Sequence, residues 1–472
     1  SEVLDRPFDP VIDGGYLGHG VAFVRDTLGP GAAIGAVVGV VVAAVVVLVL
    51  MPLALLRLSR LVAEHPRTAL RTGAAATLVW LLSAVLGLHV AAGEPVAAAG
   101  TATYAYDEVA RIPSVLRDQR DFATAAKHDP LDAVPSDQLL TTLRGKDVLF
   151  VFVESYGRVA VQGTRFSDSI DQVLRAGTTQ LAAQGYGMRS AFLTSPTFGA
   201  GSWLAHSSLQ SGLWVDGQQR YDALVTSRRQ NLSTTFHRAG WRTAGDVPAN
   251  THDWPQGRFY GYDTVYDSRN VGYKGPRFGY PTMPDQYTLD HVRRTELQPA
   301  DRKPVMAEID LISSHFSWAT LPRMVPWSSV GDGTVFAGQP AQNPSKKEIY
   351  SSDDRVQDAY ARSIRYSLSA VIGYLSTYVD PNTVMVFLGD HQPNATVSGH
   401  DSGHDVPVTV VAKDPKVIDA ISSWHWQDGL LPSPDAPTWR MDTFRDRFLT
   451  AFGTTGLGGG AHSGSVEASR VR

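Results

Sequence analysis

Two apolar runs that end in acidic residues are the feature that most constrains this chain. Residues 148–153 form an uninterrupted run, Val-Leu-Phe-Val-Phe-Val, and Glu154 follows it. Residues 383–389 form a similar apolar run, and Asp390 and His391 follow it. Such runs, rich in β-branched and aromatic residues, are typical of strands buried on both faces of a parallel sheet. In parallel sheets, ligands bind at the carboxyl ends of the strands. The two runs and the residues that follow them therefore predict a metal site at one edge of the sheet.

From Asp147 onward, apolar strand patterns alternate with helical patterns, which predicts an α/β fold with a mostly parallel sheet. The expected strands are 148–153, 188–193, 243–247, 305–312, 384–388 and 406–411. The expected helices are 169–184, 203–211, 231–239, 284–297 and 353–379. Residues 320–350, with several Pro, Gly and Ser, are expected to form a loop or insertion.

Composition narrows the classes of function. The 472 residues carry a formal net charge of −4 and include no cysteine. Because no basic stripe is present, nucleic acid is not expected as a partner. The lack of cysteine excludes disulfides, thiolate metal ligands and a cysteine nucleophile. Any metal site must therefore use oxygen and imidazole ligands.

An uncharged stretch, residues 31–56, predicts a membrane-spanning helix. At about 1.5 Å per residue, its 26 residues exceed the roughly 30 Å hydrocarbon core of a bilayer. A buried core helix is the alternative. Residues 73–92 form a second, shorter uncharged stretch. Four arginines lie between the two: Arg57, Arg60, Arg67 and Arg71. The positive-inside rule places this loop in the cytoplasm, so everything after residue 93 is expected outside the membrane.

These patterns predict five parts. They are an extracytoplasmic segment at 1–30, two transmembrane helices with a short cytoplasmic loop at 31–93, a juxtamembrane connector at 94–144, an α/β domain at 145–455, and a flexible tail at 456–472. Because the sequence begins at Ser1 without a signal peptide, further spans are expected upstream.

Residues 195–212 place a hydroxyl where a helix is expected to begin. Gly199 and Gly201 predict a tight turn, and Ser202 follows them. A hydroxyl at a helix start lies beside free backbone N–H groups, which favour phosphate or sulfate. A divalent cation on the oxygen would activate it as a nucleophile. The alternative is that Ser202 is only a helix cap.

Glu154, Ser202, Asp390 and His391 together supply oxygen and imidazole ligands suited to Mn²⁺, Zn²⁺, Mg²⁺ or Ca²⁺. Each also has a structural interpretation. Glu154 could cap a helix, and the Asp390-His391 pair could form a surface turn.

Residues 146–413 resemble the alkaline phosphatase superfamily, in its sulfatase and lipoteichoic acid synthase branch. The similarity lies in the strand ending in Glu-Ser, the Gly-rich turn before Ser202, the Gly389-Asp-His segment, and His404-Asp-Val-Pro. Ser202 is followed, at the spacing of sulfatases, by Leu209-Gln-Ser-Gly. The Cys-x-Pro-Ser-Arg core of sulfatases is absent, because residues 203–206 are Trp, Leu, Ala and His. This difference counts against sulfate ester hydrolysis. Lipoteichoic acid synthases carry Thr as the nucleophile, which supplies the same hydroxyl as Ser202.

The resemblance implies roles for individual residues. Glu154, Ser202, Asp390 and His391 correspond to the metal ligands of lipoteichoic acid synthases, with Mn²⁺ favoured as the ion. Residues that would bind the substrate phosphoryl or head group are His315, His404 (with His400 as a competitor), His252, Trp254 and Arg258. The alternatives are a core histidine for His315 and ordinary loop residues for His252 and Arg258.

The resemblance also implies a function for the domain at 145–455. It predicts a membrane-anchored, metal-dependent phosphotransferase of the phosphoglycerol or polyol-phosphate type. Such an enzyme acts outside the cell membrane on lipid or cell-envelope phosphodiesters through a phosphoseryl intermediate. One alternative is a hydrolase of the same fold, a sulfatase or phosphodiesterase. The other is a membrane protein that keeps the fold as a non-enzymatic binding module.

Overall fold

A computed structural model describes residues 29–85, 89–91, 94–95, 117–378 and 380–454, with isolated positions at 21, 24, 25, 110 and 114. The predicted tail at 456–472 and most of the predicted segment at 1–30 lie outside these residues. The chain divides into two compact units, one within residues 16–122 and the other containing the chain from residue 123 onward.

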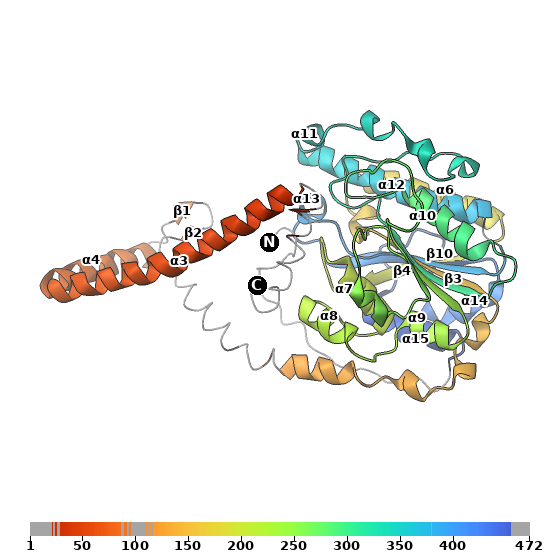
Figure 1. Ribbon diagram of the computed structural model, residues 1–472, viewed down its shortest axis with the longest axis horizontal. Helices are drawn as coiled ribbons and strands as arrows, with labels where there is room; N and C mark the ends of the chain where they lie inside the picture. The colour runs from red at the N-terminus through yellow and green to blue at the C-terminus, as the bar shows by residue number, and fades with distance from the viewer. Residues whose placement is uncertain are drawn as a thin grey trace. The chain divides into compact units, whose positions relative to one another are not determined.

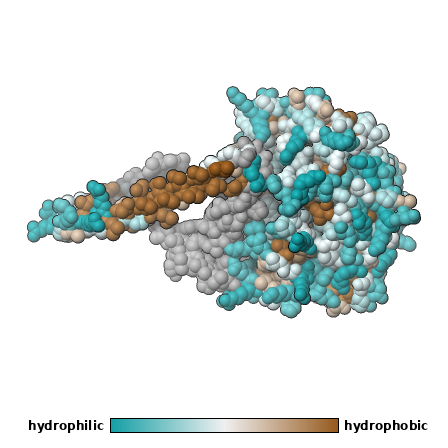
Figure 2. Space-filling model, in the orientation of Figure 1, coloured by the Kyte–Doolittle hydropathy of each residue, from teal (hydrophilic) through white to brown (hydrophobic). Residues whose placement is uncertain are grey.

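The first unit contains two helices, α3 (Pro30–Glu64) and α4 (Pro66–Val85), and a short hairpin of β1 (His89–Ala91) and β2 (Glu94–Pro95). Among the described residues, α3 alone is long and apolar enough to cross a membrane. Figure 2 shows the apolar surface that runs along it. The first predicted span is therefore confirmed as a candidate membrane anchor.

The prediction of two transmembrane helices is not supported. Helix α4 begins at Pro66, seven residues before the predicted start, so Arg67 and Arg71 lie within it. The uncharged part of α4 that is described, from Thr72 to Val85, is shorter than a membrane span. The expected cytoplasmic loop is helical as well, because Arg57 and Arg60 belong to α3 and only His65 separates the two helices.

The second unit is built on a nine-stranded sheet with the order β10-β4-β9-β8-β3-β7-β5-β6, and β11 pairs with β4. Its strands are β3 (Asp147–Val153), β4 (Gly187–Thr194), β5 (Arg242–Asp246), β6 (Thr264–Tyr266), β7 (Val305–Leu311), β8 (Thr383–Gly389), β9 (Asp405–Ala412), β10 (Gln427–Asp428) and β11 (Thr438–Arg440). Strand β3 is central and pairs in parallel with β7 and β8. Strand β9 runs antiparallel to both β8 and β4, so β4 points the same way as β3. The mostly parallel α/β sheet is confirmed.

Helices cover both faces of this sheet (Figure 1). The helices of this unit are α6 (Ser167–Ala183), α7 (Ser202–Ser211), α8 (Gln218–Val225), α9 (Leu232–Arg238), α10 (Asp285–Val292), α11 (Lys346–Ile349), α12 (Asp353–Tyr378), α13 (Ala395–Ser398), α14 (Pro415–Ala420) and α15 (Phe444–Ala451). One core packs α6 and α12 against residues such as Leu149 and Val151. The other packs α9 and α15 against Phe150 and Phe152. The alternating faces of β3 thus join the two cores.

Residues 129–143 pack into the second core rather than lying apart from it. Leu131, Leu139, Leu140 and Leu143 are fully buried among residues of the sheet and of α15. Asp129 forms ion pairs with Arg445 at 2.7 Å and with Arg229 at 2.9 Å. This part of the predicted connector therefore belongs physically to the α/β unit.

Candidate active site

The carboxyl edge of the sheet brings the predicted metal ligands together. Glu154 follows β3, and Asp390 and His391 follow β8, which lies beside β3 in parallel register. Strand β4 ends at the same edge, and the turn after it leads to Ser202 at the start of α7. Gly201, with φ of +83°, is the N-cap of α7, so Ser202 is its first helical residue and not its cap.

Ser202 lies against two of the other three residues. Its Oγ donates a hydrogen bond to Glu154 Oε2 at 3.1 Å and lies 3.3 Å from His391 Nε2. Ser202 is partly exposed, whereas Asp390 and His391 are each 1% exposed and Glu154 is 9% exposed. Ser202 is therefore partly open to solvent, whereas the charged groups that it contacts lie in the protein interior.

Backbone groups and Ser155 fix the two carboxylates. Asp390 Oδ1 accepts hydrogen bonds from the backbone N–H of Ser155 at 2.7 Å and of His391 at 2.8 Å. Ser155 Oγ donates to Glu154 Oε1 at 2.7 Å. The φ of +57° at Ser155 turns the chain directly after β3. Ser155 thus joins the two acidic residues, a role that no sequence pattern had predicted.

Several ionisable side chains lie close together in the buried part of the site. Burial and the negative charge of Glu154 raise the pKa of Asp390. Burial would also raise the pKa of Glu154, but positive charge at His315 and His391 outweighs it and lowers this pKa to about 2. Burial opposes protonation of His391, yet Asp390 and Glu154 together raise its pKa. Two buried carboxylates with one imidazole leave excess negative charge that a cation would balance.

The donor atoms fit a divalent metal ion. Ligand atoms of Glu154, Asp390 and His391 lie within 4.8 Å of one another. Among the described residues, Asp390 Oδ2 is buried and has no hydrogen-bond partner. His391 Nδ1 donates to the carbonyl oxygen of Gln392 at 2.7 Å, which leaves Nε2 as the ligand nitrogen. An unpartnered buried carboxylate oxygen that faces an imidazole nitrogen is the arrangement expected where a cation binds.

His315 and His404 are connected to the surroundings of these four residues by separate contacts. The positive charge of His315 acts on Glu154, and the neighbouring Ser314 Oγ donates to the Glu154 carbonyl oxygen at 2.6 Å. The His315 ring stacks on Tyr280 with 3.8 Å between centroids. His404 Nδ1 lies 3.3 Å from the carbonyl oxygen of Ser195, in the turn that leads to Ser202. Their predicted contact with a substrate phosphoryl group stays a prediction.

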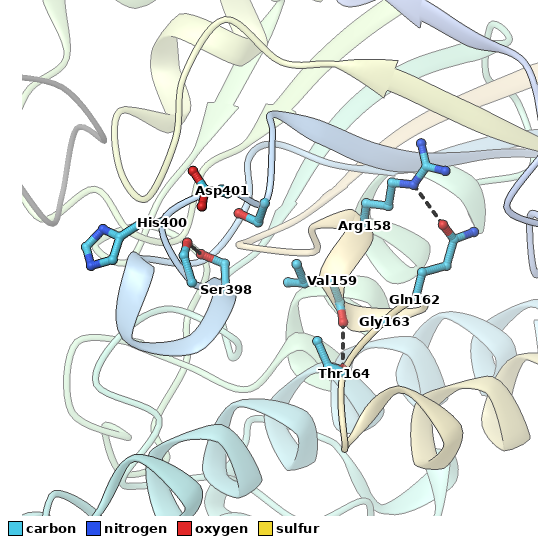
Figure 3. A pocket seen from close by; sticks show the side chains of 10 residues that line it. Arg158, Val159, Gln162, Gly163, Thr164, Ser398, His400 and Asp401 are labelled. Carbon is cyan, nitrogen blue, oxygen red and sulfur yellow. Dashed lines mark hydrogen bonds between the residues drawn. The ribbon is translucent and has the colours of Figure 1, made fainter. Parts of the chain in front are cut away.

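His400, the competitor of His404, lies beside a separate cavity of about 480 Å³. The loop at 398–402 and residues 158–164 line this cavity, and Figure 3 shows the His400 ring directed away from Arg158 and Gln162. The Arg158 guanidinium is engaged by Gln162 at 2.7 Å and by Asp405 at 3.0 Å. The choice of His404 over His400 for the substrate phosphoryl group stays a prediction.

The predicted head-group residues occupy a turn that the structure does not bring against Ser202. His252 and Arg258 are exposed, and Trp254 is partly buried against Tyr260 with 5.3 Å between ring centroids. Tyr260 stacks on Tyr262, and the Tyr262 hydroxyl donates to Glu308 at 3.0 Å. Trp254 is thus linked to the sheet edge through aromatic contacts. The roles of His252, Trp254 and Arg258 stay predictions.

A second cluster next to the site was missed by sequence analysis. His206 Nδ1 lies 3.1 Å from Glu308 Oε1 and 3.5 Å from Asp310 Oδ1. Burial raises the pKa of Asp310, with the positive charge of His206 opposing the rise. Two signals could have revealed the cluster: the helical spacing between Ser202 and His206, and acids two residues apart inside an otherwise apolar strand.

The fold and this site define an enzyme domain of the alkaline phosphatase superfamily: a mixed α/β sheet that presents Glu, Asp, His and a serine hydroxyl at one edge. A model of the sulfatase family matches residues 146–410. The chain belongs to the sulfatase family. Proteins of this family use a divalent metal ion, and the residues present here fit one.

Several solved structures are similar at low identity. The lipoteichoic acid synthase LtaP from Listeria monocytogenes is 13% identical, with a TM-score of 0.45, covering 70% of this chain and 78% of its own. The Streptococcus pyogenes phosphoglycerol transferase GacH, in complex with sn-glycerol-1-phosphate, is 12% identical, with a TM-score of 0.40, covering 72% and 91%. The periplasmic domain of EcEptC from Escherichia coli is 13% identical, with a TM-score of 0.37, covering 57% and 72%. No curated protein matches this sequence.

Proposed function

We propose that this protein is a membrane-anchored, metal-dependent phosphotransferase that acts outside the membrane on lipid or cell-envelope phosphodiesters. The observation that carries the proposal is the position of Ser202 Oγ, 3.1 Å from Glu154 and 3.3 Å from His391, beside the unpartnered oxygen of Asp390. A hydroxyl in that position is a nucleophile beside a cation site. A phosphoglycerol or polyol phosphodiester is the substrate class that we favour.

Different residues of this chain are assigned to the metal ion and to the substrate. Glu154, Ser202, Asp390 and His391 would hold the ion, with Mn²⁺ favoured among Mn²⁺, Zn²⁺, Mg²⁺ and Ca²⁺. When bound, the ion supplies charge that favours the Ser202 alkoxide and offsets negative charge on the phosphoryl oxygens.

Ser202 Oγ then attacks the phosphorus, the bond to the leaving alcohol breaks, and an acceptor hydroxyl later removes the phosphoryl group. His315 and His404 orient the phosphoryl oxygens. His252, Trp254 and Arg258 are proposed for the head group.

Two features favour phosphoryl transfer over the alternatives. Ser202 and His206 stand where sulfatases carry Cys and Arg, so a sulfatase reaction through a modified cysteine is not available here. Helix α3 fits a membrane anchor, which would place the domain where lipid donor and acceptor both reside. Hydrolysis of the same phosphodiester would use the same intermediate and differs only in the acceptor, which is water.

The fate of a labelled donor tests this proposal. The full chain in liposomes with Mn²⁺ is given phosphatidylglycerol labelled in its head group, with membrane glycolipids as acceptors. Label in a larger lipid product, absent with Ser202→Ala, supports transfer. Label released as soluble phosphoester, again dependent on Ser202, shows hydrolysis instead. Equal turnover by the wild type and Ser202→Ala would contradict both.

A further inference from the structure

His206 lies on the helix that carries the nucleophile, one turn after Ser202. Residues four apart on a helix lie on one face, about 6 Å apart. The ring packs flat on Phe152, with 3.7 Å between centroids and 13° between planes. Its Nδ1 faces two carboxylates of β7, those of Glu308 and Asp310. The ring is therefore fixed in orientation on the Ser202 side of the sheet.

The Nδ1 side of the His206 ring is hydrogen-bonded within the protein. Glu308, 3% exposed, accepts from His206 on one oxygen, and from the Gln210 amide and the Tyr262 hydroxyl on the other. In the described part of the chain, the second ring nitrogen, Nε2, has no hydrogen-bond partner, and 11% of the side chain is exposed. Nε2 is thus the nitrogen available to a bound substrate.

The surrounding charges favour the imidazolium form. Burial lowers the pKa of His206, but the negative charge of Asp310 and the hydrogen bond and charge of Glu308 raise it overall, and Asp390 adds to the rise. Glu308 and Asp310 face the ring from β7, and Asp390 acts from the loop after β8. Both ring nitrogens then carry protons, so Nε2 is a charged donor.

We propose that His206 is a further catalytic residue, which gives its Nε2 proton to the alcohol that leaves when Ser202 attacks. This inference rests on the proposed function. The Cβ atoms of residues one turn apart lie about 6 Å from each other, and a phosphoryl group on Ser202 Oγ with one hydrogen bond spans a similar length. No other described residue of α7 combines this spacing with a charged donor.

The proton and bond changes balance over the two half-reactions. In the first, the Oγ–P bond forms and the P–O bond to the leaving alcohol breaks. The alcohol oxygen takes the Nε2 proton, and the Ser202 hydroxyl proton passes to solvent. In the second, the acceptor oxygen bonds to phosphorus and the Oγ–P bond breaks. The acceptor proton returns to Nε2, and Ser202 regains its proton from solvent.

A comparison of two leaving groups tests this role in the full chain with Mn²⁺. His206→Asn keeps an amide N–H near the position of Nδ1 and removes Nε2. Head-group turnover of phosphatidylglycerol, whose leaving alkoxide needs a proton, should fall by about 10²–10³-fold. Turnover of bis(p-nitrophenyl) phosphate, whose leaving phenolate needs none, should fall less than about threefold. Gln210→Leu, which loosens Glu308 alone, should lower both rates by the same factor.

Equal losses on both substrates with His206→Asn would show that His206 only holds α7 in place, and unchanged rates would show no role; either result overturns the inference. If the wild type shows Ser202-dependent turnover, the proposed function stands whatever His206→Asn does. If the wild type turns over neither substrate, the proposed function and this inference both fail.

A second readout is the pH dependence of turnover. Phosphatidylglycerol turnover should fall as pH rises through the pKa of His206, and Asp310→Asn, which removes negative charge, should move that fall to lower pH.

Discussion

Asp390 illustrates why this site requires a partner that the chain itself does not supply. One of its oxygens accepts two backbone N–H bonds, and the other, which is buried 3.4 Å from His391 Nε2, has no hydrogen-bond partner among the described residues. An unpaired buried carboxylate oxygen beside the negative charge of Glu154 is unfavourable. A divalent cation would remove both costs at once, which explains how the charged pair can persist in the interior.

Gly389 is a second residue on which the site depends. A Cβ at this position would lie 1.9 Å from the Tyr156 carbonyl oxygen, which belongs to the turn after Glu154. Because that atom is backbone, Gly389→Ala must push the turns after β3 and β8 apart. We expect a loss of about 3 kcal/mol or more in the free energy of unfolding, together with loss of turnover. Chemical unfolding of the full chain measures the first quantity.

Gly399→Ala is the matched control for Gly389→Ala. Gly399 has φ of +78° and ψ of 170°, a backbone region nearly confined to glycine, and nothing within 4 Å of an added Cβ, so backbone strain of about 1–3 kcal/mol without a clash is expected. Equal effects of the two substitutions would contradict the close approach that is described here.

At the residue level, functional side chains that directly follow a strand or a turn could be predicted from the sequence, whereas those inside a strand could not. Glu154, Asp390 and His391 each come directly after an apolar run, and Ser202 follows two glycines, so their convergence could be predicted. Ser155 was noted only as part of the Glu-Ser end of the strand and was given no role, because a hydroxyl after an acid does not by itself indicate a contact. Glu308 and Asp310 were missed because the run that contains them, 305–312, was assigned as a buried strand without asking how its acids are satisfied.

At the level of elements, the longer strands of the sheet were predictable, whereas the two- and three-residue strands β6, β10 and β11 and the strand directions were not. Strand β3 begins one residue before the predicted run and ends at the same residue, because burial on both faces leaves little freedom in its pattern. Strand β9 has an equally apolar pattern but runs antiparallel. The pattern of apolar residues indicates whether a strand is buried, but not its direction relative to its neighbours. The direction of β9 is set by the path of the chain that precedes it. The start of α7 at Ser202 could be predicted because Gly201 adopts the left-handed conformation that ends the preceding turn.

The limits of the transmembrane prediction also lie at this level. An uncharged stretch defines the apolar part of a helix but not its ends, because charged residues continue a helix beyond the membrane at no cost. Helix α3 extends past Arg57 and Arg60 to Glu64 for this reason, and α4 starts within the expected loop.

At the scale of the whole molecule, the α/β unit begins earlier than the buried strand that opens its sheet. Arg445 is fully buried in α15, and its guanidinium pairs with Asp129. An unpaired guanidinium at that depth would be costly, so residues near 129 are required for the core that supports α7. The sequence shows no sign of this, since Asp129 and Arg445 lie far apart in the chain and neither belongs to a motif.

The side of the membrane on which the catalytic unit lies can be tested directly, because the chain has no cysteine. Ala176→Cys places one thiol on the exposed surface of α6. We expect a membrane-impermeant maleimide to label it in intact cells, as the proposed extracytoplasmic location requires. Labelling only after lysis would place the unit in the cytoplasm and refute that part of the proposal. His65→Cys, between α3 and α4, reports the side on which α3 ends.

The central claim is that one cation joins four side chains that are far apart in the sequence. Anomalous scattering from crystals of the protein soaked with Mn²⁺ measures this most directly. We expect a single strong peak in contact with Glu154, Ser202, Asp390 and His391, and no such peak with Asp390→Asn. A peak at His206, Glu308 and Asp310 instead, or Mn²⁺ bound without Ser202, would contradict the account.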